Sequence, residues 1–97
     1  MMLNDVEISA LIQRNGAMNE LIVCMEEPAE LIKELSKYIR RHNGDGYANP
    51  NIDNIIEEMA DMYIVLKIIE IMLHITNDEL EFMIDMKSDR LRERYLK

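Results

Sequence analysis

The segment from Met62 to Ile75 is apolar on nearly every side of the helix that its composition favours. Only Lys67, Glu70 and His74 interrupt it, and on a helix these three form one thin polar stripe. A helix with so little polar surface is stable only when it is buried on several sides. A chain of 97 residues folds into one small domain with few other elements to cover such a helix. We therefore expect a second copy of the chain to cover part of it, in a homodimer or a homotetramer.

The composition of the whole chain indicates an all-α protein. Gly occurs three times and Pro twice, while Leu, Ile, Met, Glu and Lys, which favour helices, dominate. We predict a single four-helix bundle-like domain over residues 1–97. The four helices are expected from about Asp5 to Asn15, from Ala17 to His42, from Pro50 to Ile75, and from Thr76 to about Tyr95.

Short local signals mark several of the helix ends. Asn4 with Glu7, and Thr76 with Glu79, have the spacing of a capping box at a helix start. Gly16 after Asn15 predicts the end of the first helix.

Each of the two prolines adds a prediction of its own. Asn49 before Pro50 is expected to cap the third helix. Pro28 lies inside the second helix, and because it lacks an amide hydrogen we expect a kink or a helix restart there.

Charge and cysteine usage narrow the function classes. A net charge of −8 argues against a general nucleic-acid binder. Cys24 is the single cysteine, so no internal disulfide is possible, as expected in a reducing cytoplasm. The N-terminus has no basic stretch typical of a signal peptide, and the run from Met62 to Ile75 is too short and too polar to span a membrane. We expect a cytoplasmic protein with neither a nucleic-acid nor a membrane partner.

Two acidic pairs lie on successive predicted helices. Glu27 with Glu30, and Glu58 with Asp61, are each three residues apart and therefore share one side of a helix. If the two helices face each other, four carboxylates converge. Such a cluster repels itself unless it is protonated or binds a cation. Its all-oxygen ligands suit a hard ion, Mg²⁺ or alternatively Mn²⁺.

The position of the second pair favours a functional site over a solvated face. Glu58 and Asp61 lie on the same helix side as the apolar Val65 and Ile68, which points the two acids inward. Acids on an exposed helix face usually have no such neighbours. The chain has no Glu-x-x-His pair, which disfavours a di-iron carboxylate bundle.

The two motifs together resemble those of the MazG-like, all-α nucleoside triphosphate pyrophosphohydrolase superfamily. The stretch from Glu26 to Leu31 matches the first motif, E-E-x-x-E, although Pro28 replaces a more usual small or apolar residue. The stretch from Glu58 to Asp61 matches the second motif, E-x-x-D, and the resemblance extends from about Asn19 to Arg94. It implies Mg²⁺-dependent hydrolysis of (deoxy)nucleoside triphosphates to a monophosphate and pyrophosphate. The implied metal ligands are Glu27, Glu30, Glu58 and Asp61.

The resemblance also implies roles for residues outside the metal ligands. By chemistry and not by the resemblance, Glu26 or another acid that holds no metal is the candidate to accept a proton from the attacking water. The implied substrate-binding residues are Asn19, Lys37, Lys87, Arg90 and Arg94.

Two alternative functions stay open. One is a non-enzymatic helical oligomer, an adaptor or inactive relative, with solvated acids and a basic helix end that only complements the helix dipole. The other is a phosphohydrolase that cleaves elsewhere in the phosphate chain.

Overall fold

The computed structural model describes residues 1–42 and 51–97, and these residues form helices and no strand. The predicted all-α chain of four helices is confirmed. The expected cap at Asn49 lies outside the described residues. The helices are α1 (Asp5–Asn15), α2 (Ala17–His42), α3 (Ile52–Met72) and α4 (Asn77–Tyr95).

The predicted capping boxes are present at the starts of α1 and α4. The Asn4 side chain accepts a hydrogen bond from the Glu7 amide at 2.8 Å, and the Glu7 carboxylate accepts one from the Asn4 amide at 3.0 Å. Thr76 and Glu79 make the same reciprocal pair. At the end of α1, Gly16 adopts a φ of 89°, which a residue with a side chain rarely does. These contacts satisfy amides and carbonyls that the helices leave unpaired.

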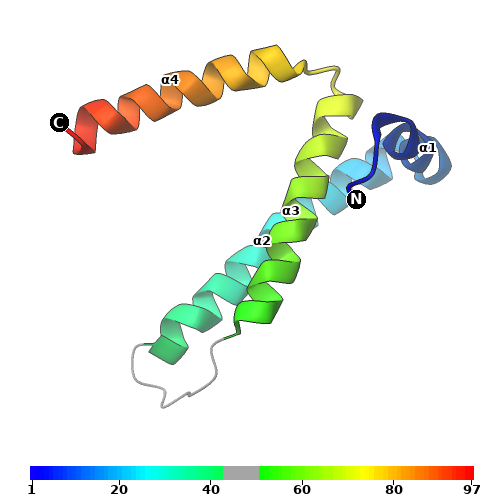
Figure 1. Ribbon diagram of the computed structural model, residues 1–97. Helices are drawn as coiled ribbons and strands as arrows, with labels where there is room; N and C mark the ends of the chain where they lie inside the picture. Colours follow the sequence, from blue (N-terminus) through cyan, green and yellow to red (C-terminus); the bar gives the residue numbers. More distant parts are fainter. Residues whose placement is uncertain (43–50) are drawn as a thin grey trace.

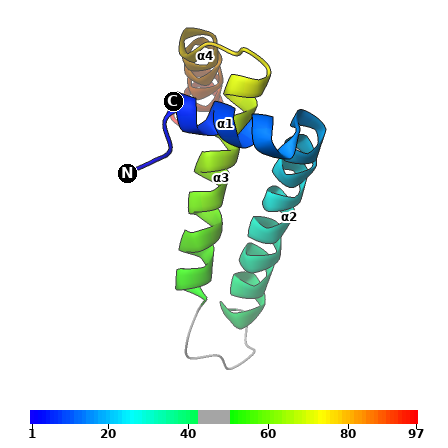
Figure 2. The same ribbon diagram turned by 90° about the vertical axis from the view of Figure 1, so that its right-hand side faces the viewer.

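Helices α2 and α3 lie side by side as an antiparallel pair, and α1 packs across the end of that pair where α2 begins (Figures 1 and 2). The core sits where the three helices meet, and its buried apolar residues are Ile8, Cys24, Val65 and Ile68. Ile8, on α1, is fully buried. The small core means that most of the two long helices is in contact with one neighbour only.

Helix α2 runs through Pro28 without a break. The predicted helix restart at this position is therefore wrong. Pro28 removes the amide that the carbonyl of Cys24 accepts from in a regular helix. Packing of α2 against α3 on both sides of this point holds the helix together, which a local sequence signal does not report.

Helix α3 is shorter than predicted at its end. It was expected to reach Ile75, but it ends at Met72. His74 then adopts a φ of 55°, and the chain turns into the cap formed by Thr76.

Helix α4 leaves the end of α3 as an arm and lies away from α2 (Figure 1). None of its residues is buried. Five of its apolar side chains lie on one stripe and are all exposed, whereas Phe82 and Met86 lie on the other side of the helix; the five are Leu80, Met83, Ile84, Leu91 and Tyr95. Across the described ranges, we find no helix that combines the length and the apolar character needed to cross a bilayer.

Candidate metal centre

The contact between α2 and α3 brings three of the predicted ligands together. Glu27 projects from α2, and Glu58 and Asp61 project from α3. One carboxylate oxygen from each lies within 4.8 Å of the other two. All three residues are half-buried, so the cluster sits at the edge of the helix contact and is open to solvent. The predicted inward position of the α3 acids and their approach to the first motif are thus present in the fold.

Burial and mutual repulsion make the carboxylates of this cluster harder to ionise. Burial raises the pKa of Glu27 above its usual value, and the charges of Asp61 and Glu58 and a side-chain hydrogen bond with Asp61 raise it further. Burial also raises the pKa of Glu58, followed by the charges of Asp61 and Glu30. Both shifts mean that the negative charges are poorly compensated by the protein itself.

One carboxylate oxygen of the cluster lacks a hydrogen-bond partner among the residues that the structure describes. Glu58 Oε2 is buried and accepts no hydrogen bond from the described residues. The ion pairs between described residues also leave out Glu27, Glu58 and Asp61. A buried, unpartnered carboxylate oxygen beside two further carboxylates has the donor chemistry that Mg²⁺ or Mn²⁺ requires. The residues present therefore fit a hard divalent cation.

The other two acids of the first motif lie outside this group. Glu30 is exposed, and its oxygens are not among the three that converge. Its charge still raises the pKa of both Glu27 and Glu58, so it borders the cluster. Glu26 is exposed on a different side of α2 from Glu27.

A further acid, Glu34, was not singled out by the sequence. It is buried on α2 near the start of α3, where its charge adds to the raised pKa of Glu58. Asn51 Nδ2 donates to Glu34 Oε2 at 2.7 Å and to the Glu34 carbonyl at 2.9 Å. This contact ties the two helices together beside the cluster. Its position in the sequence could have indicated it, because Glu34 follows Glu27 by seven residues and therefore shares its side of the helix.

The predicted substrate-binding residues are spread over the chain. Lys37 lies on the same helix as the first motif, and its Nζ pairs with Glu34 Oε1 at 3.3 Å. Asn19 Nδ2 donates to the carbonyl of Asn15 at 2.9 Å and so closes the turn between α1 and α2. The remaining three, Lys87, Arg90 and Arg94, lie on α4, which a single chain directs away from the acids (Figure 1).

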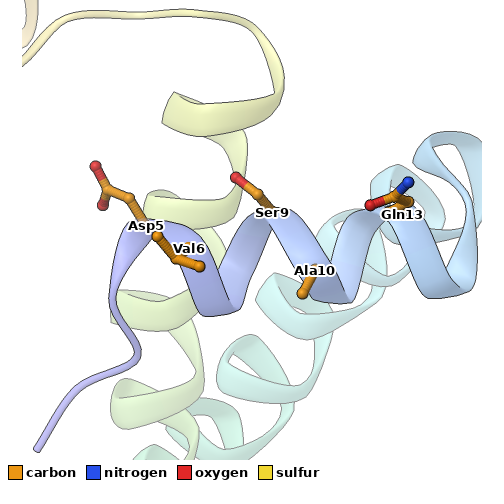
Figure 3. Close-up of a pocket in the computed structure, with 5 residues that line it drawn as sticks. All are labelled: Asp5, Val6, Ser9, Ala10 and Gln13. Carbon is orange, nitrogen blue, oxygen red and sulfur yellow. The ribbon is translucent and has the colours of Figure 1, made fainter.

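Two surface hollows lie elsewhere and are not lined by the acids. One is formed by α1 alone, with Asp5, Val6 and Ser9 among the side chains along its surface (Figure 3). The other lies between α1 and the end of α3 and includes Lys67 and His74. A hollow lined by a single helix has no facing element to enclose a ligand, so we assign it no function.

Comparisons with protein-family models, with curated proteins and with solved structures find no match to this chain. The class that fold and site define is therefore an all-α, four-helix protein with a carboxylate cluster between its two long helices.

Proposed function

We propose that the chain is a MazG-like pyrophosphohydrolase that hydrolyses nucleoside triphosphates to monophosphate and pyrophosphate with Mg²⁺ at the α2–α3 acid cluster. The observation that carries the proposal is the convergence of Glu27, Glu58 and Asp61 within 4.8 Å. The unpartnered Glu58 oxygen and the raised pKa values of Glu27 and Glu58 support it, because a divalent cation would relieve both.

The charge pattern explains why a triphosphate needs a cation at this site. Three converging carboxylates repel the phosphates of a substrate, so binding requires a bridging positive charge. We assign Glu27, Glu58 and Asp61 to hold Mg²⁺, with Glu30 completing the set from the border of the cluster. The chemistry that the bound ion supplies is neutralisation of phosphate oxygens and a lower pKa for a coordinated water.

Proton transfer and charge on the leaving group are assigned to other residues. Glu26 is exposed and free of the cluster, and we propose that it accepts the proton of the attacking water. Lys37 is placed on the helix of the first motif, where it can neutralise phosphate charge. Lys87, Arg90 and Arg94 are proposed to do the same, although α4 of the same chain does not carry them to the acids.

The test is a screen of canonical and modified nucleoside triphosphates with pyrophosphate detection, with and without Mg²⁺. We expect pyrophosphate release that depends on Mg²⁺ and falls on the order of a hundredfold or more in Glu58→Gln. The matched control is Glu81→Gln on α4, which makes the same chemical change at an exposed residue outside the cluster. Equal activity in both variants would remove the acid cluster from the proposal.

One alternative has an observation in its favour. The broad exposed apolar surfaces of α3 and α4 suit a non-enzymatic helical oligomer or adaptor. Such a protein would release no pyrophosphate from any triphosphate in the screen, and millimolar Mg²⁺ would leave its melting temperature unchanged. Release of inorganic phosphate in place of pyrophosphate would instead indicate a phosphohydrolase that cleaves elsewhere in the chain of phosphates.

A further inference from the structure

Helix α3 carries a second apolar stripe on the side opposite α2. Its residues follow one another at intervals of four, three, four and three, and each is between 43% and 67% exposed: Ile52, Ile56, Met59, Tyr63 and Leu66. Alternation of three and four is the spacing with which one helix packs along another. Within the described chain no helix covers this stripe, which we call the outward stripe of α3.

The solvent-accessible surface of the chain is larger than that of a typical folded monomer of the same mass. A monomeric protein of 11.4 kDa exposes about 5,800 Å² by the usual scaling of surface with mass, whereas this chain exposes 7884 Å². The excess is about 2,000 Å² for each chain and therefore about 4,000 Å² for two chains, which lies within the roughly 2,000–5,000 Å² that obligate homodimers bury over both partners.

The outward stripe is also suited to pairing with itself. In a two-fold dimer the same patch must meet its own copy. The three–four alternation holds when the helix is read from either end, so two antiparallel copies of the outward stripe place apolar residues opposite apolar residues. The outward stripe contains no charged residue between Ile52 and Leu66 that such pairing would bury.

We infer that a second copy of this chain covers the outward stripe of α3 in an antiparallel arrangement, and that the apolar stripe of α4 is buried in the same dimer. This interface lies on the side of α3 facing away from the acid cluster, and the inference does not rest on the proposed activity. The α4 stripe contributes because the outward stripe alone is too small to account for the excess area.

The first experiment is sedimentation equilibrium on the full chain at micromolar concentrations. We expect the mass of two chains for the wild type. Tyr63→Glu introduces a charge within the outward stripe and should raise the dimer dissociation constant on the order of a hundredfold or more. The matched control is Val6→Glu, which puts the same charge at a residue that is 78% exposed on α1, and its dimer should be unchanged.

A second measurement keeps the inference testable if Tyr63→Glu fails to fold. In Met59→Cys a short bis-maleimide should link two chains, whereas Val6→Cys should give no such product, and Cys24 is buried in both. A wild type that sediments as one chain overturns the inference and indicates that α4 folds back onto its own chain. A dimer that survives Tyr63→Glu but dissociates in Met25→Glu, on the exposed side of α2, also overturns it.

Discussion

Asp61→Asn should make the metal-free protein more stable and the metal-dependent protein less active. The substitution keeps the size of the side chain and removes one negative charge from the cluster. The amide of Asn can also donate a hydrogen bond to Glu27, which a carboxylate does only when it is protonated. Stability gained by removing a functional group indicates a site that strains the fold.

The expected size follows from the cluster geometry. Two unit charges 4.8 Å apart repel by about 1 kcal/mol in a water-like dielectric, which is the appropriate choice for half-exposed groups. Relief of the repulsion between Asp61 and Glu27 alone should therefore raise the free energy of unfolding by about 1 kcal/mol. In a domain of this size that corresponds to a rise of about 4–8 °C in melting temperature.

The assay is thermal unfolding, followed by circular dichroism at one fixed protein concentration, in EDTA and then in millimolar Mg²⁺. In EDTA at low salt, Asp61→Asn should melt above the wild type, and the difference should shrink as salt screens the repulsion. In Mg²⁺ the wild type should gain stability, by about 2.7 kcal/mol at a hundredfold excess over the dissociation constant, and the variant should gain less. The control Asp85→Asn, at an exposed residue of α4, should behave as the wild type does.

Two results would refute the reasoning. If Asp61→Asn melts at or below the wild type in EDTA, the acids do not repel one another enough to matter, and the cluster is a solvated face. If Mg²⁺ stabilises wild type and Asp61→Asn equally, Asp61 does not hold the ion. Unchanged behaviour in both conditions is what an ordinary surface substitution produces.

Three further predictions follow from the same structure. Burial and the neighbouring carboxylates raise the pKa values of Glu27 and Glu58 above their usual range, so protonation stabilises the metal-free fold at low pH and this contribution is lost as the pH rises through the raised values. In urea unfolding in EDTA, the free energy of unfolding should therefore fall over this pH range, and the fall should be smaller in Glu58→Gln. Asn51→Ala removes both hydrogen bonds to buried Glu34 and should cost about 1–3 kcal/mol, measured as a lower urea midpoint. Ile8→Ala empties a fully buried position and should cost about 2–5 kcal/mol in the same assay, whereas Val6→Ala on the exposed side of α1 should stay within about 0.5 kcal/mol of the wild type.

The ends of the helices were largely predictable because their signals are local. Asn4, Thr76 and Gly16 act within one turn of the chain, and the structure places each of them where its sequence neighbours indicate. The side of α3 that carries Glu58 and Asp61 was predictable for the same reason, since helical periodicity alone relates them to the apolar residues that follow. The all-α class, and the assignment of the acids to one side of each helix, required no more than this.

The membership of the cluster was decided by tertiary packing. Glu27 and Glu30 are about 60° apart around the helix axis, and only the angle at which α2 meets α3 selects Glu27 for the contact and leaves Glu30 at its border. Burial of Glu34 depends on Asn51, seventeen residues away, and continuity of α2 through Pro28 depends on contacts with α3. The direction of α4 likewise follows from the turn at His74, after which the arm lies away from α2 in the described part of the chain. Local sequence patterns fix which side of a helix is acidic or apolar, but which of those sides meet is a property of the packed chain.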